Sequence, residues 1–91
     1  MNSSANWDLH VEPGVLRTSR KLSRNDARKI SDVIRLLPVD PYAGDIEKIK
    51  GAEDTWRRRV GAYRIFYKLL PREKKILVFY LERRTSATYR H

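Results

Sequence analysis

The chain has 91 residues, no cysteine, and 20 Lys plus Arg against 11 Asp plus Glu, for a net charge of +9. This length allows one domain, and the lack of cysteine excludes a disulfide scaffold, a thiol nucleophile and a cysteine-based zinc site. No apolar run approaches the ~20 residues of a membrane span, and no signal-peptide core follows the first residue, so we expect a soluble, cytoplasmic protein.

The first half of the chain predicts one strand and a helical hairpin. Residues 1–6 are polar and are expected to form a flexible N-terminal tail. Residues 7–12 alternate apolar and polar side chains, as a half-buried strand does. Pro13 suits the first turn of a helix, and Ser23 is a good N-cap for a second helix, which Pro38 ends.

The second half of the chain has the pattern of strands. Residues 55–60 and 63–69 flank a two-residue Gly-Ala turn, as in a β-hairpin. The continuous apolar run 76–81 predicts a central strand covered on both faces. We therefore expect one α+β domain over residues 7–91, in which an N-terminal strand, a helical hairpin and a three-stranded antiparallel meander form a four-stranded sheet with the helices on one face.

The excess positive charge lies entirely in the second half. Residues 1–47 carry seven basic and seven acidic side chains, whereas residues 48–91 carry thirteen basic and four acidic ones. A net charge of this size indicates a polyanionic partner, either nucleic acid or an anionic membrane surface. Because a surface without a special partner usually mixes its signs, the segregation favours a dedicated anion-binding face.

Strand alternation sorts these charges onto two faces. If the strands pair antiparallel, Arg57, Arg59 and Arg64 converge on the face that the helices leave open. Phe66 then lies among them as a flat surface. Guanidinium groups match phosphate geometry and an aromatic ring can stack on a base, so this face suits nucleic acid; the alternative is an ordinary solvated strand face. Arg58 is predicted to point inward or toward an edge and has no assigned role.

The sequence offers little for metal-dependent chemistry. The two histidines, His10 and His91, cannot alone make a zinc site, and the basic half has only scattered acids. If the protein cuts a nucleic acid, we expect it to use no metal or other cofactor. Arg and Lys would stabilise charge, and Tyr, His or Glu would move protons.

Two motifs resemble those of RelE/ParE toxins. Residues 48–51 read KIKG and residues 56–67 read WRRRVGAYRIFY. This resembles the family's K-L-K-G turn followed by W-R-x-R-x-G-x-Y-R-φ-φ-Y, where φ is apolar. Residues 82–89 read ERRTSATY and resemble the family's Arg-rich ending with its closing tyrosine. The predicted order of elements is also that of the family.

The resemblance implies a toxin of a toxin–antitoxin pair. In the RelE branch, such a toxin is a ribosome-dependent endoribonuclease that cleaves mRNA in the decoding site and inhibits translation. The ribose 2′-hydroxyl attacks the adjacent phosphate and leaves a cyclic phosphate and a 5′-hydroxyl, without metal. The implied partners are the ribosome, mRNA and an acidic antitoxin protein that covers the helical hairpin or the basic face, with no membrane.

The resemblance also implies roles for individual residues. Arg64 matches an arginine that stabilises charge on the scissile phosphate, Arg83 matches a second phosphate-facing arginine, and Tyr89 matches a tyrosine that stacks on a base and can accept a proton. The predicted substrate-binding residues are Arg57, Arg59, Lys50 and Phe66.

The sequence offers two candidates for the general base. Tyr89 would need neighbouring cations to lower its pKa from the ordinary value of about 10. Other family members use a glutamate near the K-L-K turn as the base and a C-terminal histidine as the acid. Glu47, as a loop acid, and His91 are the corresponding second candidates.

Two other functions compete with the nuclease. One is a ParE-like inhibitor of DNA gyrase, which keeps the fold but has no RNA-cutting site. The other is a catalytically silent nucleic-acid-binding domain, whose affinity would come from counterion release. The combination of Arg57, Arg64, Arg83 and Tyr89 favours the nuclease, because an inhibitor has no need for that set.

Overall fold

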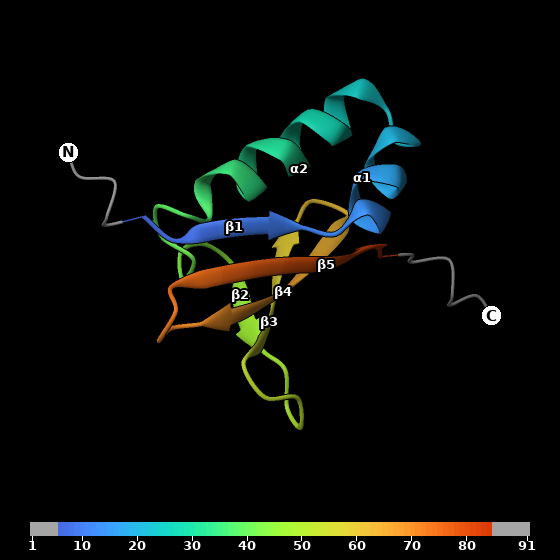
Figure 1. Cartoon of the computed structure of the whole chain (residues 1–91). Coiled ribbons are helices and arrows are strands. Elements are labelled where there is room, and N and C mark those ends of the chain that lie inside the picture. The colour runs from blue at the N-terminus through green and yellow to red at the C-terminus, as the bar shows by residue number, and fades with distance from the viewer. Residues whose placement is uncertain (1–5, 85–91) are drawn as a thin grey trace.

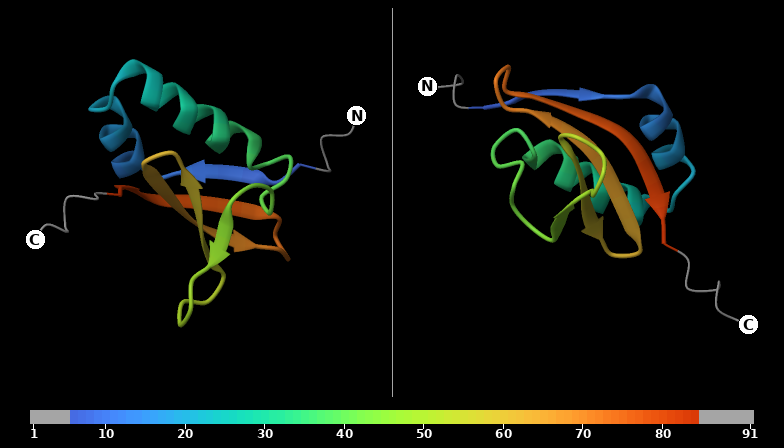
Figure 2. Two further views of the ribbon diagram at one scale, coloured as in Figure 1. Left: turned by 180° about the vertical axis from the view of Figure 1, so that it is seen from behind. Right: turned by 90° about the horizontal axis from the view of Figure 1, so that it is seen from below.

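Two helices cover one face of a five-stranded sheet in the computed structural model, which describes residues 6–84 (Figure 1). The elements in chain order are β1 (Asp8–Val11), α1 (Pro13–Arg20), α2 (Arg24–Leu36), β2 (Ile46–Lys48), β3 (Thr55–Val60), β4 (Tyr63–Leu70) and β5 (Lys75–Arg83). The strand order is β1-β5-β4-β3-β2; β1 runs parallel to β5 and the other pairs are antiparallel. Figure 2 shows both helices on the same side of the twisted sheet. The predicted α+β architecture and element order are confirmed.

The sheet has one strand more than the sequence predicts. β2 has only three residues and pairs antiparallel with β3, with Glu47 opposite Arg57. Three residues are too few to show strand alternation, and the segment lies between two loops. The predicted count of four strands is therefore wrong, because β2 adds a fifth strand at the edge. Glu47 is a strand residue rather than a loop acid.

The helices begin where local signals place them. The Ser23 hydroxyl oxygen accepts a hydrogen bond from the Asp26 backbone N–H at 3.1 Å and so caps α2. Pro13 occupies the first turn of α1, where its missing N–H has no cost. Val15 of α1 and Ile30 of α2 are buried against the sheet. In residues 6–84, neither helix is long and apolar enough to cross a bilayer.

The core lies between the helices and the covered face of the sheet. Alternate residues of β4 and β5 are buried there, together with three residues of the helical layer. The set is Tyr63, Ile65, Tyr67, Leu69, Ile76, Val78, Leu81, Val15, Ile30 and Leu37. Full burial of one aliphatic side chain stabilises the fold by about 1.5–3 kcal/mol. A one-residue slip of β4 would expose its whole set, so the core fixes the strand register.

A β-bulge in β5 changes which residues face the helices. Phe66 pairs with Tyr80 and Tyr67 pairs with Val78, so Phe79 is the extra residue. Phe79 and Tyr80 are 36% and 52% exposed. The prediction that this strand is covered on both faces is therefore wrong. Within residues 6–84, the helices cover one face only, and the other is open.

Candidate functional site

Three arginines meet on the open face of the sheet. Arg59 of β3 lies opposite Arg64 of β4, and Arg57 lies opposite Phe66. Cross-strand partners point to the same face, so all four side chains share it. The arginines line a small pocket together with two acids; its lining, called the arginine pocket below, is Asp45, Glu47, Arg57, Arg59 and Arg64. The structure thus brings together the three arginines that strand alternation predicted to converge.

Each arginine of the pocket has a carboxylate nearby. Arg57 Nη2 donates to Glu47 Oε1 at 2.5 Å, and Arg64 Nη1 donates to Glu82 Oε2 at 2.7 Å. Arg59 Nε lies 3.7 Å from a carboxylate oxygen of the loop before β2. Solvent-accessible ion pairs of this kind contribute only about 0–1 kcal/mol. A phosphate, which accepts two parallel hydrogen bonds from a guanidinium, can therefore displace these carboxylates.

Arg83 does not join the arginine pocket. It pairs with Tyr63, whose side chain is buried under the helices, whereas its neighbour Glu82 pairs with Arg64. The Cζ atom of Arg83 lies 5.9 Å from the Tyr63 ring centre, within cation–π range. The structure does not bring Arg83 and Arg64 together, because they lie on opposite faces of the sheet; the phosphate-facing role of Arg83 stays a prediction.

The β-bulge explains this outcome. In a strand without a bulge, every second residue after the buried Ile76 would face the helices. Glu82 would then lie on the covered face and Arg83 on the open one. The extra residue, Phe79, shifts the alternation by one position. Glu82 consequently takes the place opposite Arg64.

Aromatic rings adjoin the arginine pocket. The ring centroid of Phe66 lies 6.4 Å from that of Phe79 and 5.7 Å from that of Tyr80. Because Phe66 faces Arg57 across the β3–β4 ladder, these rings lie beside the arginines. Strand alternation identified only Phe66. The other two were missed because they belong to an apolar run whose directions depend on the bulge.

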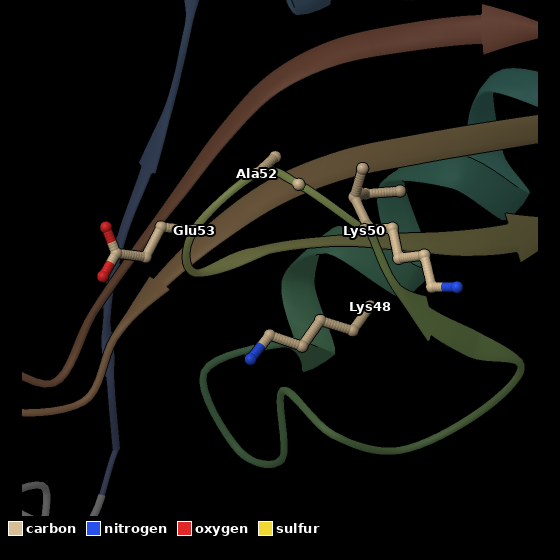
Figure 3. A pocket seen from close by; sticks show the side chains of 6 residues that line it. Lys48, Lys50, Ala52 and Glu53 are labelled. Atoms are coloured by element: carbon tan, nitrogen blue, oxygen red, sulfur yellow. The ribbon is translucent and has the colours of Figure 1, made fainter.

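Lys50 does not line the arginine pocket. It lies on the loop between β2 and β3 (Figure 3). Residues 49–53 of this loop, with the last residue of β2, line a separate shallow pocket. Lys48 contributes to it, and its Nζ lies 6.0 Å from the centre of the Trp56 ring. Gly51 has a φ of +79°, a conformation that glycine adopts without strain. Lys50 extends the positive surface, but it does not line the pocket that contains the predicted substrate-binding residues Arg57 and Arg59.

Of the two candidate bases, only Glu47 lies within residues 6–84. It is exposed on β2 and bonded to Arg57. Tyr89 and the candidate acid His91 lie outside the described residues, so their predicted roles remain predictions. The hydrogen bond to Arg57 places the Glu47 carboxylate in the arginine pocket.

Arg58, for which the sequence suggested no role, fastens the loop that leads into the pocket. Its Nη1 donates to the Ala43 carbonyl oxygen at 2.9 Å. A Cβ on Gly44 would lie 2.3 Å from Arg58 Cζ, so the guanidinium packs directly against this glycine. Asp45, the next residue, lines the pocket. Arg58 therefore positions one wall of the site from the covered side of the sheet.

The comparisons with known proteins identify the class of this basic domain. Residues 8–87 match the family described as the ParE toxin of the type II toxin–antitoxin system parDE. The chain belongs to this family, within the RelE/ParE toxin superfamily, and is a toxin of a toxin–antitoxin system. The predicted resemblance is confirmed.

Similar proteins come from archaea and bacteria. The protein named RelE1 of Methanocaldococcus jannaschii is 25% identical over 84 residues, which cover 89% of this chain and 93% of that protein. The RelE–RelB complex of Pyrococcus horikoshii OT3 contains a chain that matches with a TM-score of 0.78 and 23% identity, over 90% of this chain and 99% of that one. The isolated Escherichia coli RelE toxin matches with a TM-score of 0.72 and 16% identity, over 87% and 85% of the two chains. The fold is therefore RelE-like.

Proposed function

We propose that this toxin is a ribosome-dependent endoribonuclease that cleaves mRNA and thereby inhibits translation in the cytoplasm. The observation that carries the proposal is the convergence of Arg57, Arg59 and Arg64 on the open face. Three guanidinium groups at one place suit a phosphodiester, and Phe66 beside them suits a base. The names of the E. coli and P. horikoshii structures as RelE add support.

In the proposed reaction, the ribose 2′-oxygen attacks the adjacent phosphorus. A 2′,3′-cyclic phosphate forms as the bond from phosphorus to the 5′-oxygen breaks. Arg64 stabilises the negative charge that grows on the non-bridging oxygens, while Arg57 and Arg59 hold the backbone in line. The 2′-hydroxyl proton passes to a base, and the leaving 5′-oxygen takes a proton from an acid, for which His91 is the candidate.

The base is either Glu47 or Tyr89. Glu47 bonds to Arg57, so a phosphate that takes over Arg57 would free the Glu47 carboxylate next to the sugar. Tyr89 is supported by the motif alone. Parallel substitutions, Glu47→Gln and Tyr89→Phe, separate the two, because loss of the base lowers the cleavage rate more than RNA affinity.

The proposed protein partner is an acidic antitoxin. Several similar structures are complexes with RelB, among them those from P. horikoshii and Mycobacterium tuberculosis. Acidic side chains of such a partner would form ion pairs with the same arginines that pair with carboxylates within this chain. A pull-down from the native host that recovers no small acidic protein would count against it.

Inhibition of DNA gyrase is the second candidate function. The ParE name of the matching family favours it, and so does the position of Arg83, which an RNA-cutting site was expected to use. An inhibitor that acts by protein contact needs no arginine on a phosphate. Gyrase supercoiling measured with and without the purified toxin tests this function directly.

Induced expression followed by mapping of mRNA 5′ ends tests the proposed function. We expect growth arrest and new 5′ ends within translated mRNA, and cleavage by purified toxin only when ribosomes carry the message. Arg64→Ala should abolish the new ends. Growth arrest with intact mRNA and inhibited gyrase would overturn the proposal in favour of the second candidate.

A further inference from the structure

Phe66, Phe79 and Tyr80 form a continuous aromatic surface on the open face, here called the aromatic platform. The two ring-to-ring distances of 6.4 and 5.7 Å show that both β5 rings adjoin Phe66. Consecutive strand residues normally point to opposite faces. The bulge places Phe79 and Tyr80 on the same face, and bulges that redirect side chains occur often beside functional sites.

The platform exposes ring surface where a solvated sheet face usually carries polar side chains. Its surroundings are basic: Arg57 lies across from Phe66 on β3, and Lys68 is the next residue of β4 on the same face. Aromatic rings bordered by cations are the combination that binds single-stranded nucleic acid, because bases stack on the rings while phosphates meet the cations. An acidic partner would contact only the cations of this surface, and a purely apolar partner only its rings.

We propose that the aromatic platform stacks the bases of single-stranded RNA next to the scissile phosphate. Tyr80 pairs with Phe66, and two residues further along, Glu82 pairs with Arg64. Two strand residues span about 7 Å, the length of about two nucleotides of stacked strand. A strand held at Arg64 therefore reaches the platform with its neighbouring bases. The proposal rests on the proposed function for its substrate and concerns the binding step alone.

Stacking of this kind supplies affinity without sequence selection. Every base has a flat face, so the platform has no means to prefer one base over another. Hydrogen bonding by the Tyr80 hydroxyl is not required, and a phenylalanine at this position would serve equally well. The platform thus helps to hold any message rather than to choose a codon.

Binding of a labelled single-stranded oligoribonucleotide to the full chain, without ribosomes, tests the proposal. The oligonucleotide carries 2′-O-methyl groups so that it cannot be cleaved, and fluorescence anisotropy is recorded at several salt concentrations. Tyr80→Ala and, separately, Phe79→Ala should each weaken binding about fivefold or more. The slope of log affinity against log salt should stay unchanged, because no cation is removed.

Two control variants sharpen the measurement. Tyr80→Phe keeps the ring and should bind as the unchanged protein does. Leu36→Ala removes an exposed apolar side chain of α2, 62% accessible and on the helical side of the molecule, and should have no effect. Circular dichroism shows that each variant is folded; if Tyr80→Ala fails to fold, Phe79→Ala carries the test.

Several results would overturn the platform. These are normal RNA affinity in Tyr80→Ala and Phe79→Ala, an equal loss in Leu36→Ala, or no measurable binding by the unchanged protein. Loss of antitoxin binding with unchanged RNA affinity would show a protein-docking surface instead. Cleavage on ribosomes is scored separately, so weakened binding without any cleavage in the unchanged toxin would reject the nuclease and leave the platform standing.

Discussion

Arg64 and Glu82 lie directly opposite each other on β4 and β5, and the guanidinium donates to the carboxylate at 2.7 Å. Their side chains are 29% and 33% exposed, whereas the carboxylates of the other two pairs at the pocket are 66% and 71% exposed. Charges that are partly shielded from water interact more strongly than fully hydrated ones. Glu82 is therefore the strongest competitor that a phosphate meets at Arg64.

Glu82→Gln should strengthen RNA binding. The substitution keeps a hydrogen-bonding side chain but removes the charge that competes for Arg64, so affinity should rise by up to about fivefold. The plot of log affinity against log salt should become steeper by about 0.7, the value for one more phosphate contact on a single strand. Glu73→Gln removes the same charge from the exposed turn before β5 and is the control. An equal change in both variants would show only a net-charge effect.

Arg64→Ala should reduce cleavage far more than binding. Removal of one donor that acts on the transition state typically lowers the rate by about 10²–10³-fold, whereas the ground state loses one of several phosphate contacts. Single-turnover cleavage on programmed ribosomes gives the rate, and ribosome co-sedimentation gives the affinity. Arg72→Ala, on the exposed turn between β4 and β5, removes an arginine outside the pocket and should leave both unchanged. Equal losses in rate and affinity would contradict the role of Arg64.

Arg83 and Arg84 are adjacent arginines that can be compared for one role, the stabilisation of charge on the scissile phosphate. Arg83 lies beside Tyr63 on the covered side, whereas continued alternation puts Arg84 on the side of Glu82. The Arg84 Nε is buried, and it has no hydrogen-bond partner within residues 6–84. We therefore expect Arg84→Ala to lower cleavage about tenfold or more, as loss of a charge-stabilising donor does, and Arg83→Ala to leave it nearly unchanged. The reverse order would restore the assignment that the motif alone implies.

The fold could be predicted largely because most of its elements carry a local signal. Ser23 as a cap, Pro13 at a first turn and the two-residue turn before Tyr63 mark element ends whatever the rest of the chain does. β2 carries no such signal. Its three residues become a strand only because β3 offers an edge next to them, and a pairing partner distant in sequence is invisible to a local pattern.

The candidate site could be predicted only where alternation is unbroken. β3 and the first half of β4 run without a shift, and Arg57, Arg59 and Arg64 lie as expected. In β5 one extra residue, Phe79, shifts the alternation, so that each side chain after it points to the face opposite the one expected. No property of the apolar run marks that residue, because Phe79 and Tyr80 fit a buried or an exposed position equally well by composition.

Gly44→Ala should destabilise the fold more than Gly51→Ala. Both glycines have positive φ values, +88° and +79°, so each substitution carries backbone strain of about 1–2 kcal/mol. Only at Gly44 would the new Cβ also meet the Arg58 guanidinium; at Gly51 no neighbouring atom of the described part of the chain lies within 4 Å. Urea denaturation measures both, and combining Gly44→Ala with Arg58→Ala should recover the steric part. Equal costs at the two glycines would show that Arg58 moves aside freely.

Tyr67→Phe should lower stability at neutral pH and change its response to alkali. The fully buried Tyr67 donates a hydrogen bond from its hydroxyl to the Pro41 carbonyl oxygen at 3.0 Å, and the substitution should cost about 1–3 kcal/mol by leaving that carbonyl unpaired. Burial raises the pKa of Tyr67 to about 12. In the unfolded chain the phenol ionises near pH 10, so the unfolded state loses its proton first.

The folded state should therefore lose stability as the pH rises from about 10 through about 12, and Tyr67→Phe should lose less over that interval. Urea midpoints at pH 7 and at steps between pH 9 and pH 11.5 measure this difference. Tyr80→Phe makes the same chemical change at an exposed ring and should leave the free energy of unfolding at neutral pH within about 0.5 kcal/mol of that of the unchanged protein. Parallel alkaline profiles for Tyr67→Phe and the unchanged protein would mean that the Tyr67 phenol ionises as readily in the fold as in the unfolded chain, and that the loop at Pro41 is not closed over it.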